Sequence, residues 1–397
     1  MLIAILTLVL CLLSLHHTNC NIFSGRWVHH PSYPLYDALK SPYIVKPFNC
    51  KPNRRPDSDY QEWRWQPNGC DIPRFSARGL LEKLRGKKLR FVGDSISQNQ
   101  FLSLICLVSK EFPTTFIPSS YKNDKFISTV CRLMDSKVFI AVKYHAQSVG
   151  ILSREFPQIK NLDCRSPPFK ENHLPLKPQI VGISEDNCFL HRVLSIEFFW
   201  APFLVDLEIN HERKRIVHVD EIQNNSVHWR ADIFIFESSK WWRENLGKQR
   251  WDIIMEGQKI YTDMKPLVAY KKALITWSHW VSSNVNPQTL VFFRSNSYSH
   301  YNRKRRCASE KEPIEDPSYN PHPTVYAAIL HQVLSTTKFP VKFFNASLNS
   351  AFRKDGHPSI YTSLNISAPE HQDCTHWCLP GVPDSWNQLF YATLLGA

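Results

Sequence analysis

The chain has 397 residues, of which 43% are hydrophobic, and its formal net charge is +13. A chain of this length and composition can bury a sizeable core, as one large domain or as two ordinary ones. Intrinsic disorder is therefore excluded as its main state.

The first residues contain an apolar run from Leu2 to Leu15. It is too short to span a membrane comfortably and lies where the core of a signal peptide belongs. We expect residues 1–19 to be a signal peptide or, because no Lys or Arg precedes the run, a short uncleaved signal anchor. Both alternatives direct the chain to the secretory pathway, to the Golgi lumen or membrane, or to secretion. Contact with a membrane is expected only for the anchor.

The cysteines fit such a compartment. Of the eleven, Cys11 lies in this first segment, and the default use of the others in an oxidising lumen is pairing into disulfides. Zinc is the competing use, but no pair has the CxxC spacing of a structural site, so we expect no metal. Sequons at Asn224, Asn345 and Asn365 fit a lumenal glycoprotein.

Positive charge is most concentrated in residues 303–306, with the sequence Arg-Lys-Arg-Arg. In a cytosolic protein this run would suggest nucleic acid, which we do not expect in a lumenal one. There it favours an anionic polysaccharide by long-range attraction, and a solvated loop without a partner is the alternative.

Along the chain, residues 20–84 are rich in Pro, Trp and Cys and lack sustained periodicity, so we expect a disulfide-tied cap packed on a main domain over residues 85–397. Within that domain, residues 112–187 form an irregular insert for which the sequence predicts no structure.

Short uninterrupted apolar runs predict strands buried on both faces of a parallel sheet, and apolar spacing of three and four residues predicts helices. The strands are Leu89–Val92, Ile233–Phe236, Leu290–Phe293 and, as a fourth candidate, Val341–Phe344; the helices are Ile96–Val108, Met264–Val281 and Val325–Leu334. Their alternation predicts an α/β protein, a three-layer α/β/α sandwich with a mostly parallel sheet. Active sites of such sheets lie at the carboxyl ends of the strands.

The strand Leu89–Val92 runs into Gly93, Asp94 and Ser95, where a helix is predicted to begin. A serine there has its hydroxyl at the sheet edge and its backbone N–H near a helix amino terminus, which stabilises an oxyanion. Ser95 is therefore a candidate nucleophile, although such a tripeptide also serves simply as a turn and N-cap.

A serine hydroxyl needs an imidazole to accept its proton, and that imidazole needs a carboxylate to orient it. Asp373 and His376 supply both within one local turn. The alternative is that Asp373 caps a helix and His376 is a surface residue.

Beyond these residues, the chain from Cys20 to its carboxyl terminus resembles the plant trichome birefringence-like family of polysaccharide O-acetyltransferases, and most closely the branch of the powdery-mildew-resistance pectin acetylation proteins. The motifs that carry the resemblance are VGDS at 92–95 with Asn99 and Gln100, RPDSDY at 55–60, WQP at 65–67, WAPFLV at 200–205, WW at 241–242, RKDGHPS at 353–359, DCTHWCLPG at 373–381 and PDSWN at 383–387.

The resemblance implies an SGNH-like fold for the main domain and acetyl transfer to a hydroxyl of a plant cell-wall polysaccharide, pectin or a glucuronic-acid-bearing xylan. Ser95 would form the acyl-enzyme, His376 would act as base, and Asp373 would orient it. The acetyl donor would be acetyl-CoA or a lumenal carrier, with no bound cofactor. The resemblance also implies disulfides, which are Cys20 to Cys70, Cys50 to Cys378 and Cys307 to Cys374.

Two positions depart from the family pattern. Ser41 stands where relatives usually have Cys, so Cys106 is expected to lack its disulfide partner. Glu237 stands where many relatives have an Asn before the paired Trp. If that Asn donates to the oxyanion, an ionised Glu237 cannot replace it, because a carboxylate only accepts hydrogen bonds.

Several further residues are predicted to bind substrate or support the site. They are Asp94, Asn99, Trp241, Trp242, Arg294 and His300. Asp355 and His357 could be mistaken for the acid–base pair, but we expect them in a satisfied hydrogen-bond network near the surface.

Two other functions are open. The same triad would act as a polysaccharide acetylesterase if water resolved the acyl-enzyme. A catalytically inactive wall-polysaccharide binder would retain the fold, its basic charge and its aromatic side chains.

Overall fold

The computed structural model describes residues 20–111, 115–116, 128–134, 137–143, 194–222, 226, 229–243, 250–301, 307–316, 318–363 and 372–396. The expected signal segment, the basic run at 303–306 and the sequons at Asn224 and Asn365 lie outside these residues. Within them, no helix is both long and apolar enough to cross a membrane.

The chain folds into two compact units. The first consists of the N-terminal segment up to Phe75, Ser297–Pro321 and the C-terminal segment from Asn345 onward; the second consists of Ser76–Asn296 and His322–Phe344.

The second unit contains an eight-stranded sheet in the order β14-β13-β10-β3-β7-β5-β6-β4. Neighbouring strands from β14 to β7 are parallel, and β5 is antiparallel to β7 and β6. The strands are β3 (Lys88–Gly93), β4 (Thr115–Phe116), β5 (Ser128–Met134), β6 (Lys137–Lys143), β7 (Leu194–Trp200), β10 (Ile233–Phe236), β13 (Leu290–Arg294) and β14 (Val341–Phe344). The mostly parallel sheet and the four predicted strands are confirmed.

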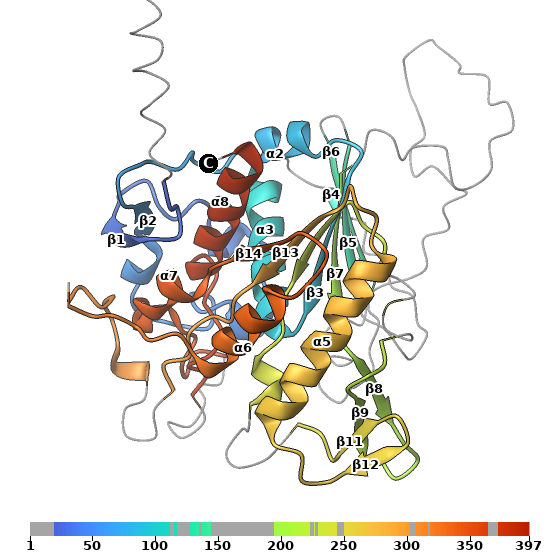
Figure 1. The fold of residues 1–397 in the computed structure, drawn as a ribbon. Helices are drawn as coiled ribbons and strands as arrows, with labels where there is room; N and C mark the ends of the chain where they lie inside the picture. Colours follow the sequence, from blue (N-terminus) through green and yellow to red (C-terminus); the bar gives the residue numbers. More distant parts are fainter. Residues whose placement is uncertain are drawn as a thin grey trace, which may run out of the picture. The chain divides into compact units, whose positions relative to one another are not determined.

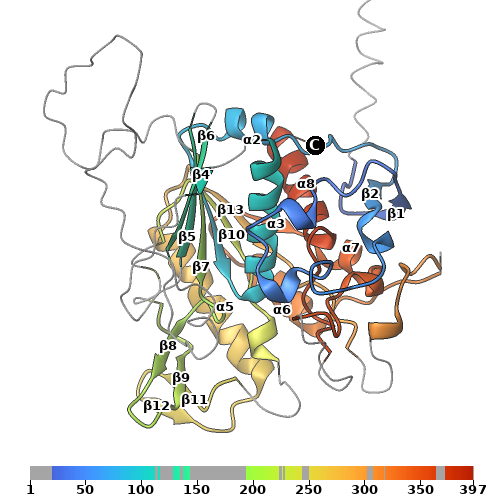
Figure 2. The ribbon, with the colours of Figure 1, turned by 180° about the vertical axis from the view of Figure 1, so that it is seen from behind.

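Helices cover both faces of this sheet (Figures 1 and 2). On one face lie α2 (Ala77–Lys83) and α3 (Ser95–Glu111), and on the other lie α5 (Pro266–Asn284) and α6 (Val325–Leu334). Phe101 of α3 packs on Phe91 of β3 at 5.9 Å between ring centroids, and Trp277 of α5 packs on Phe293 of β13 at 4.8 Å. The predicted three-layer α/β/α arrangement is therefore confirmed within this unit.

Helix α5 begins at Pro266, two residues after the predicted start at Met264. Proline is favoured in the first turn because its missing N–H would have no partner there, and it fixes the start of the helix.

A second, four-stranded sheet of the same unit was not predicted. Its order is β12-β11-β9-β8, and its strands are β8 (Asp206–Ile209), β9 (Arg215–His218), β11 (Ile253–Glu256) and β12 (Lys259–Tyr261). A short 3-10 helix, η5 (Lys240–Trp242), follows β10. Three strands of the main sheet, β4, β5 and β6, lie inside the 112–187 segment.

The first unit joins segments from both ends of the chain. Its elements are β1 (Gly25–His29) paired with β2 (Trp63–Pro67), the helices α7 (Ser347–Ala351) and α8 (Val382–Leu395), and the 3-10 helices η1 (Ala38–Lys40), η2 (Lys46–Phe48), η3 (Asp59–Gln61), η6 (Cys307–Ser309) and η7 (Lys354–Gly356).

The disulfides of this unit are Cys20–Cys70, Cys50–Cys378 and Cys307–Cys374. All three pairings implied by the family resemblance are confirmed. Cys106 lies buried in α3 outside these pairs, and the Ser41 hydroxyl donates to the backbone oxygen of Asp37 at 2.8 Å.

Candidate active site

Strand β3 ends at Gly93, and the next residues turn the chain into α3. Asp94 Oδ1 accepts a hydrogen bond of 2.8 Å from the backbone N–H of Ile96, which fixes the turn. Ser95 is the first residue of α3 and is half-buried, whereas its neighbours on both sides are buried. Its hydroxyl therefore lies at the carboxyl edge of the sheet, at the helix end whose partial positive charge stabilises an oxyanion.

Only glycine fits at position 93. A Cβ there would lie 2.3 Å from the backbone oxygen of Glu237 and 2.6 Å from Ser97 Oγ. The approach is close because Glu237 N donates to Val92 O at 3.0 Å, which continues the pairing of β3 with β10. Gly93 thus allows the Ser95 turn to pack against the end of β10.

Charged residues stand at the ends of three neighbouring strands. Asp94 follows β3, Glu237 follows β10, and Arg294 ends β13, and all three are buried. Arg294 Nη2 lies 3.4 Å from Glu237 Oε2. The sequence predicted Asp94 and Arg294 as supporting residues, but it treated Glu237 only as a departure from relatives.

The acid and base candidates lie in a tight turn of the first unit. Asp373 Oδ2 and His376 Nδ1 are 2.7 Å apart. Asp373 Oδ1 accepts the backbone N–H groups of Thr375 at 3.1 Å and of His376 at 3.0 Å. Both carboxylate oxygens therefore have donors, which holds the acid in one orientation.

The protonation state of the Asp373 carboxyl group follows from this geometry. Burial alone would raise the pKa of Asp373, but the adjacent His376 and the hydrogen bonds lower it below its usual range. An ionised Asp373 keeps the imidazole proton on Nδ1. In this tautomer, Nε2 of His376 is the ring atom that can take a proton from a hydroxyl.

Covalent and backbone bonds fasten this turn on both sides. Cys374 is bound to Cys307, and Cys378 is bound to Cys50. Asp373 also exchanges two backbone hydrogen bonds of 2.9 Å with Ser359. Such constraints limit the motion of the acid–base pair relative to the rest of its unit.

Two further histidines lie beside the pair. The Nε2 atom of His357 is 2.7 Å from Nδ1 of His300, and its Nδ1 is 2.7 Å from the backbone oxygen of His376. His357 is 1% exposed and stacks on Trp377 at 4.1 Å, so its expected position near the surface is wrong. The contact with His300 was missed because 57 residues separate the two, and the RKDGHPS motif gave the only signal.

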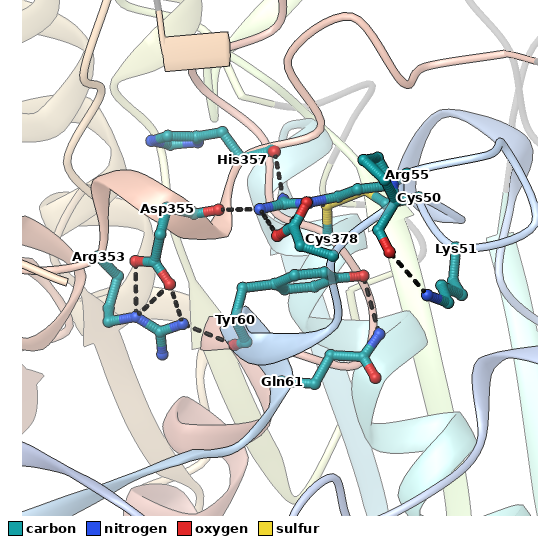
Figure 3. A network of polar contacts seen from close by, with 11 residues as sticks. Cys50, Lys51, Arg55, Tyr60, Gln61, Arg353, Asp355, His357 and Cys378 are labelled. Atoms are coloured by element: carbon teal, nitrogen blue, oxygen red, sulfur yellow. Dashed lines mark hydrogen bonds and ion pairs between the residues drawn. A yellow bond between two sulfur atoms is a disulfide. The ribbon is translucent and has the colours of Figure 1, made fainter. Parts of the chain in front are cut away.

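A buried polar network supports this region (Figure 3). Arg353 binds both carboxylate oxygens of Asp355 and donates to the backbone oxygen of Tyr60 at 2.6 Å. Arg55 donates to the backbone oxygens of Asp355 at 2.8 Å and of His357 at 3.0 Å, and lies 3.8 Å from the Tyr60 ring centroid. Burial raises the pKa of Tyr60 to about 12, which keeps the phenol neutral.

Replacing Arg353 by Met is expected to lower the free energy of unfolding by about 3–5 kcal/mol, because it leaves the Asp355 carboxylate buried without its partner. The matched control is Lys354→Met, whose pair with Glu310 is partly exposed and should contribute less than about 1 kcal/mol. Denaturant unfolding of the three proteins measures the difference. Equal losses for both variants would contradict a structural role for the Arg353–Asp355 pair.

The remaining predicted residues lie in the second unit. Trp242 is fully buried, and its ring packs on Phe203 at 4.8 Å; Trp241 is partly buried and packs on Trp200 at 5.4 Å. Asn99 is fully buried in α3. Trp242 and Asn99 therefore have no exposed surface for direct contact with a sugar, whereas Trp241 keeps part of its surface exposed.

Comparison with known proteins gives two family matches. Residues 72–150 and 184–393 match the GDSL/SGNH-like acyl-esterase family found in Pmr5 and Cas1p, and residues 18–71 match the PMR5 N-terminal domain. The first match agrees with the SGNH-like fold that the resemblance implied.

Individual relatives cover nearly the whole chain. Trichome birefringence-like 36 of Arabidopsis thaliana is 34% identical over 95% of this chain and 86% of that protein, and trichome birefringence-like 43 is 36% identical over 94% and 88%. The trichome birefringence protein of the same plant is 34% identical over 95% of this chain and 56% of its own length.

Proposed function

This chain belongs to the trichome birefringence-like family, with its GDSL/SGNH-like acyl-esterase domain, and we propose that it is an O-acetyltransferase acting on a plant cell-wall polysaccharide. The observation that carries the proposal is the hydrogen bond of 2.7 Å between Asp373 and His376. Together with a serine at a strand-to-helix turn, this pair supplies the groups that acyl transfer requires.

The mechanism has two steps. His376 Nε2 takes the proton of the Ser95 hydroxyl as Ser95 Oγ attacks the donor carbonyl, and the protonated imidazole returns that proton to the leaving group. His376 Nε2 then takes the proton of a sugar hydroxyl as its oxygen attacks the acyl-enzyme carbonyl, and the imidazolium returns that proton to Ser95 Oγ as the acyl–serine bond breaks. The proposal requires Ser95 Oγ to come within hydrogen-bonding reach of His376 Nε2 during the reaction.

We propose pectin or a glucuronic-acid-bearing xylan as the acceptor, because the net charge of +13 attracts an anionic chain. The donor is acetyl-CoA or a lumenal acetyl carrier, used as a substrate, with no resident cofactor. The disulfides fit an oxidising compartment, which supports a site of action in the secretory pathway.

Hydrolysis is the second candidate, and the match to an acyl-esterase family favours it. The same acyl-enzyme would then be resolved by water instead of a sugar hydroxyl. The two activities share the first step and differ only in the second acceptor.

The test uses the full chain, expressed through a secretory pathway and incubated with an acetyl donor and either pectin or xylan oligosaccharides. Mass spectrometry of the oligosaccharides and quantification of free acetate separate the outcomes. Acetylated oligosaccharide supports the transferase and identifies its acceptor. Acetate release from acetylated oligosaccharide without transfer supports the esterase, and binding with neither product indicates an inactive binder.

A further inference from the structure

Two carboxyl groups meet beside the candidate nucleophile. Asp94 and Glu237 are both 0% exposed, and they follow the neighbouring strands β3 and β10, where Phe236 is paired with Val92 and the backbone N–H of Glu237 donates to Val92 O. Among the described residues, no N–H or O–H donor reaches Asp94 Oδ2 or Glu237 Oε2 in hydrogen-bond geometry. Ionised carboxylates only accept hydrogen bonds and repel each other, so two of them buried at adjacent strand ends, each with an oxygen that lacks a donor, favour a proton on one.

The cations around the pair do not remove this preference. Arg294 faces Glu237 from β13, with Nη2 3.4 Å from Oε2, and Lys240 faces it from η5. Among the described residues, Arg243, Arg250 and Tyr270 also interact electrostatically with one or both carboxyl groups. Burial raises the pKa of Glu237 well above its usual range, Asp94 raises it further, and Arg294 and Lys240 offset only part of the rise.

A second buried glutamate shows the contrast. Glu197 on β7 lies directly opposite Arg90 on β3, and the guanidinium donates to Oε2 through Nε at 2.8 Å. Burial favours the neutral acid there too, but Arg90 lowers the pKa of Glu197 below its usual range. Glu237 instead lies near Asp94 and a more distant guanidinium, so burial and the neighbouring carboxyl group outweigh the cations and favour the protonated form.

We propose that Asp94 and Glu237 hold one proton between them, and that this acid pair positions the turn that carries Ser95. Asp94 binds the backbone N–H of Ile96 through Oδ1, so a proton shared at its other oxygen fixes the side chain at both ends. Ser95 stands between Asp94 and Ile96 in the chain, so the bond to Ile96 closes the turn that carries it. Glu237 is thus a positioning residue that acts through Asp94.

The shared proton also sets the charge beside Ser95. The pair carries one negative charge instead of two, next to the place where the proposed reaction develops an oxyanion. A further negative charge in a buried site would raise the energy of that oxyanion by Coulomb repulsion. This consequence for catalysis rests on the proposed function, whereas the shared proton does not.

The sign of the pH effect follows from the raised pKa. A carboxyl group whose pKa is raised in the folded state contributes stability that is fully present below its unfolded pKa and is lost as the pH rises through the folded value. The melting temperature of the wild type should therefore fall by several degrees between about pH 5 and pH 9. Glu237→Gln, which stays neutral, should lack this part of the fall, and Glu221→Gln, at an exposed position, should keep it.

Infrared spectroscopy tests the wild type directly, independent of how the variant folds. A carboxylic-acid carbonyl band should persist at neutral pH in the wild type and in Glu221→Gln and be absent from Glu237→Gln. If no such band is seen in the wild type at neutral pH, or if the Gln variant melts with unchanged pH dependence, the shared proton is wrong.

Labelling of Ser95 by a fluorophosphonate tests the catalytic consequence. The ratio of the labelling rate at pH 9 to that at pH 6 should be about tenfold lower in the wild type than in Glu237→Gln. Equal ratios in the two proteins would show that the pair does not act on Ser95. A persistent acid band together with no labelling at any pH would reject the proposed function and leave the shared proton standing.

Discussion

Replacing Ser95 by Ala is expected to lower acetyl transfer by roughly 10⁴- to 10⁶-fold, because the variant lacks the hydroxyl that forms the proposed acyl-enzyme. Removal of a nucleophile leaves only the contributions of binding and of the oxyanion site. The rate of product formation measured by mass spectrometry reports this loss. The variant should also fail to trap a fluorophosphonate.

The matched control is Ser109→Ala, which removes a hydroxyl from the same helix. That hydroxyl donates only to the backbone oxygen of Cys106 at 3.0 Å. Its loss should leave both transfer and labelling unchanged. If Ser95→Ala and Ser109→Ala had equal activity, the Ser95 acyl-enzyme would be excluded.

Replacing Asp373 by Asn is expected to reduce the catalytic rate by about 10⁴-fold while the fold is retained. An amide can still accept the backbone N–H groups of Thr375 and His376, but it cannot hold the imidazole proton on Nδ1 or stabilise the imidazolium. The affected quantity is therefore kcat, which steady-state kinetics separates from KM.

Asp316→Asn provides the control for this substitution. Asp316 accepts hydrogen bonds from the backbone and hydroxyl of Ser318 in an exposed turn. Its loss should not alter the catalytic rate. A rate for Asp373→Asn within about threefold of the wild type would show that Asp373 does not orient the base.

Both variants also separate the two candidate reactions from the binder. Transfer and hydrolysis share the acyl-enzyme, so both activities should be lost in Ser95→Ala and in Asp373→Asn. Oligosaccharide binding, in contrast, should survive both changes if the positive charge of the surface provides it.

Local patterns predicted the sheet and the helices that cover it. Runs such as Ile233–Phe236 are recognisable because a strand buried on both faces is apolar at every position, whereas a half-exposed strand alternates polar and apolar residues. Strands β8 and β9 were missed because they mix polar and apolar residues over only four positions each.

The candidate site was predictable where its parts are close in sequence. Asp373 and His376 are three residues apart, and Ser95 stands at a recognisable turn. The placement of Glu237 near Asp94 and the His300–His357 contact depend instead on how distant strands and loops meet, which periodicity does not encode. Glu237 is an example. Its effect on an oxyanion depends on whether its carboxyl group is protonated, and its buried surroundings, which the sequence pattern does not reveal, decide this protonation state.

The Cys50–Cys378 bond joins residues 328 positions apart and closes next to His376. During synthesis, Cys50 cannot form this disulfide until Cys378 has been synthesised. The turn that carries His376, the proposed base, is therefore fastened only after that. The Ser95 turn is therefore synthesised long before the turn that carries His376 can be fixed by this disulfide. Disulfide formation, rather than translation of the Ser95 region, would therefore be the step that completes the proposed acid–base turn.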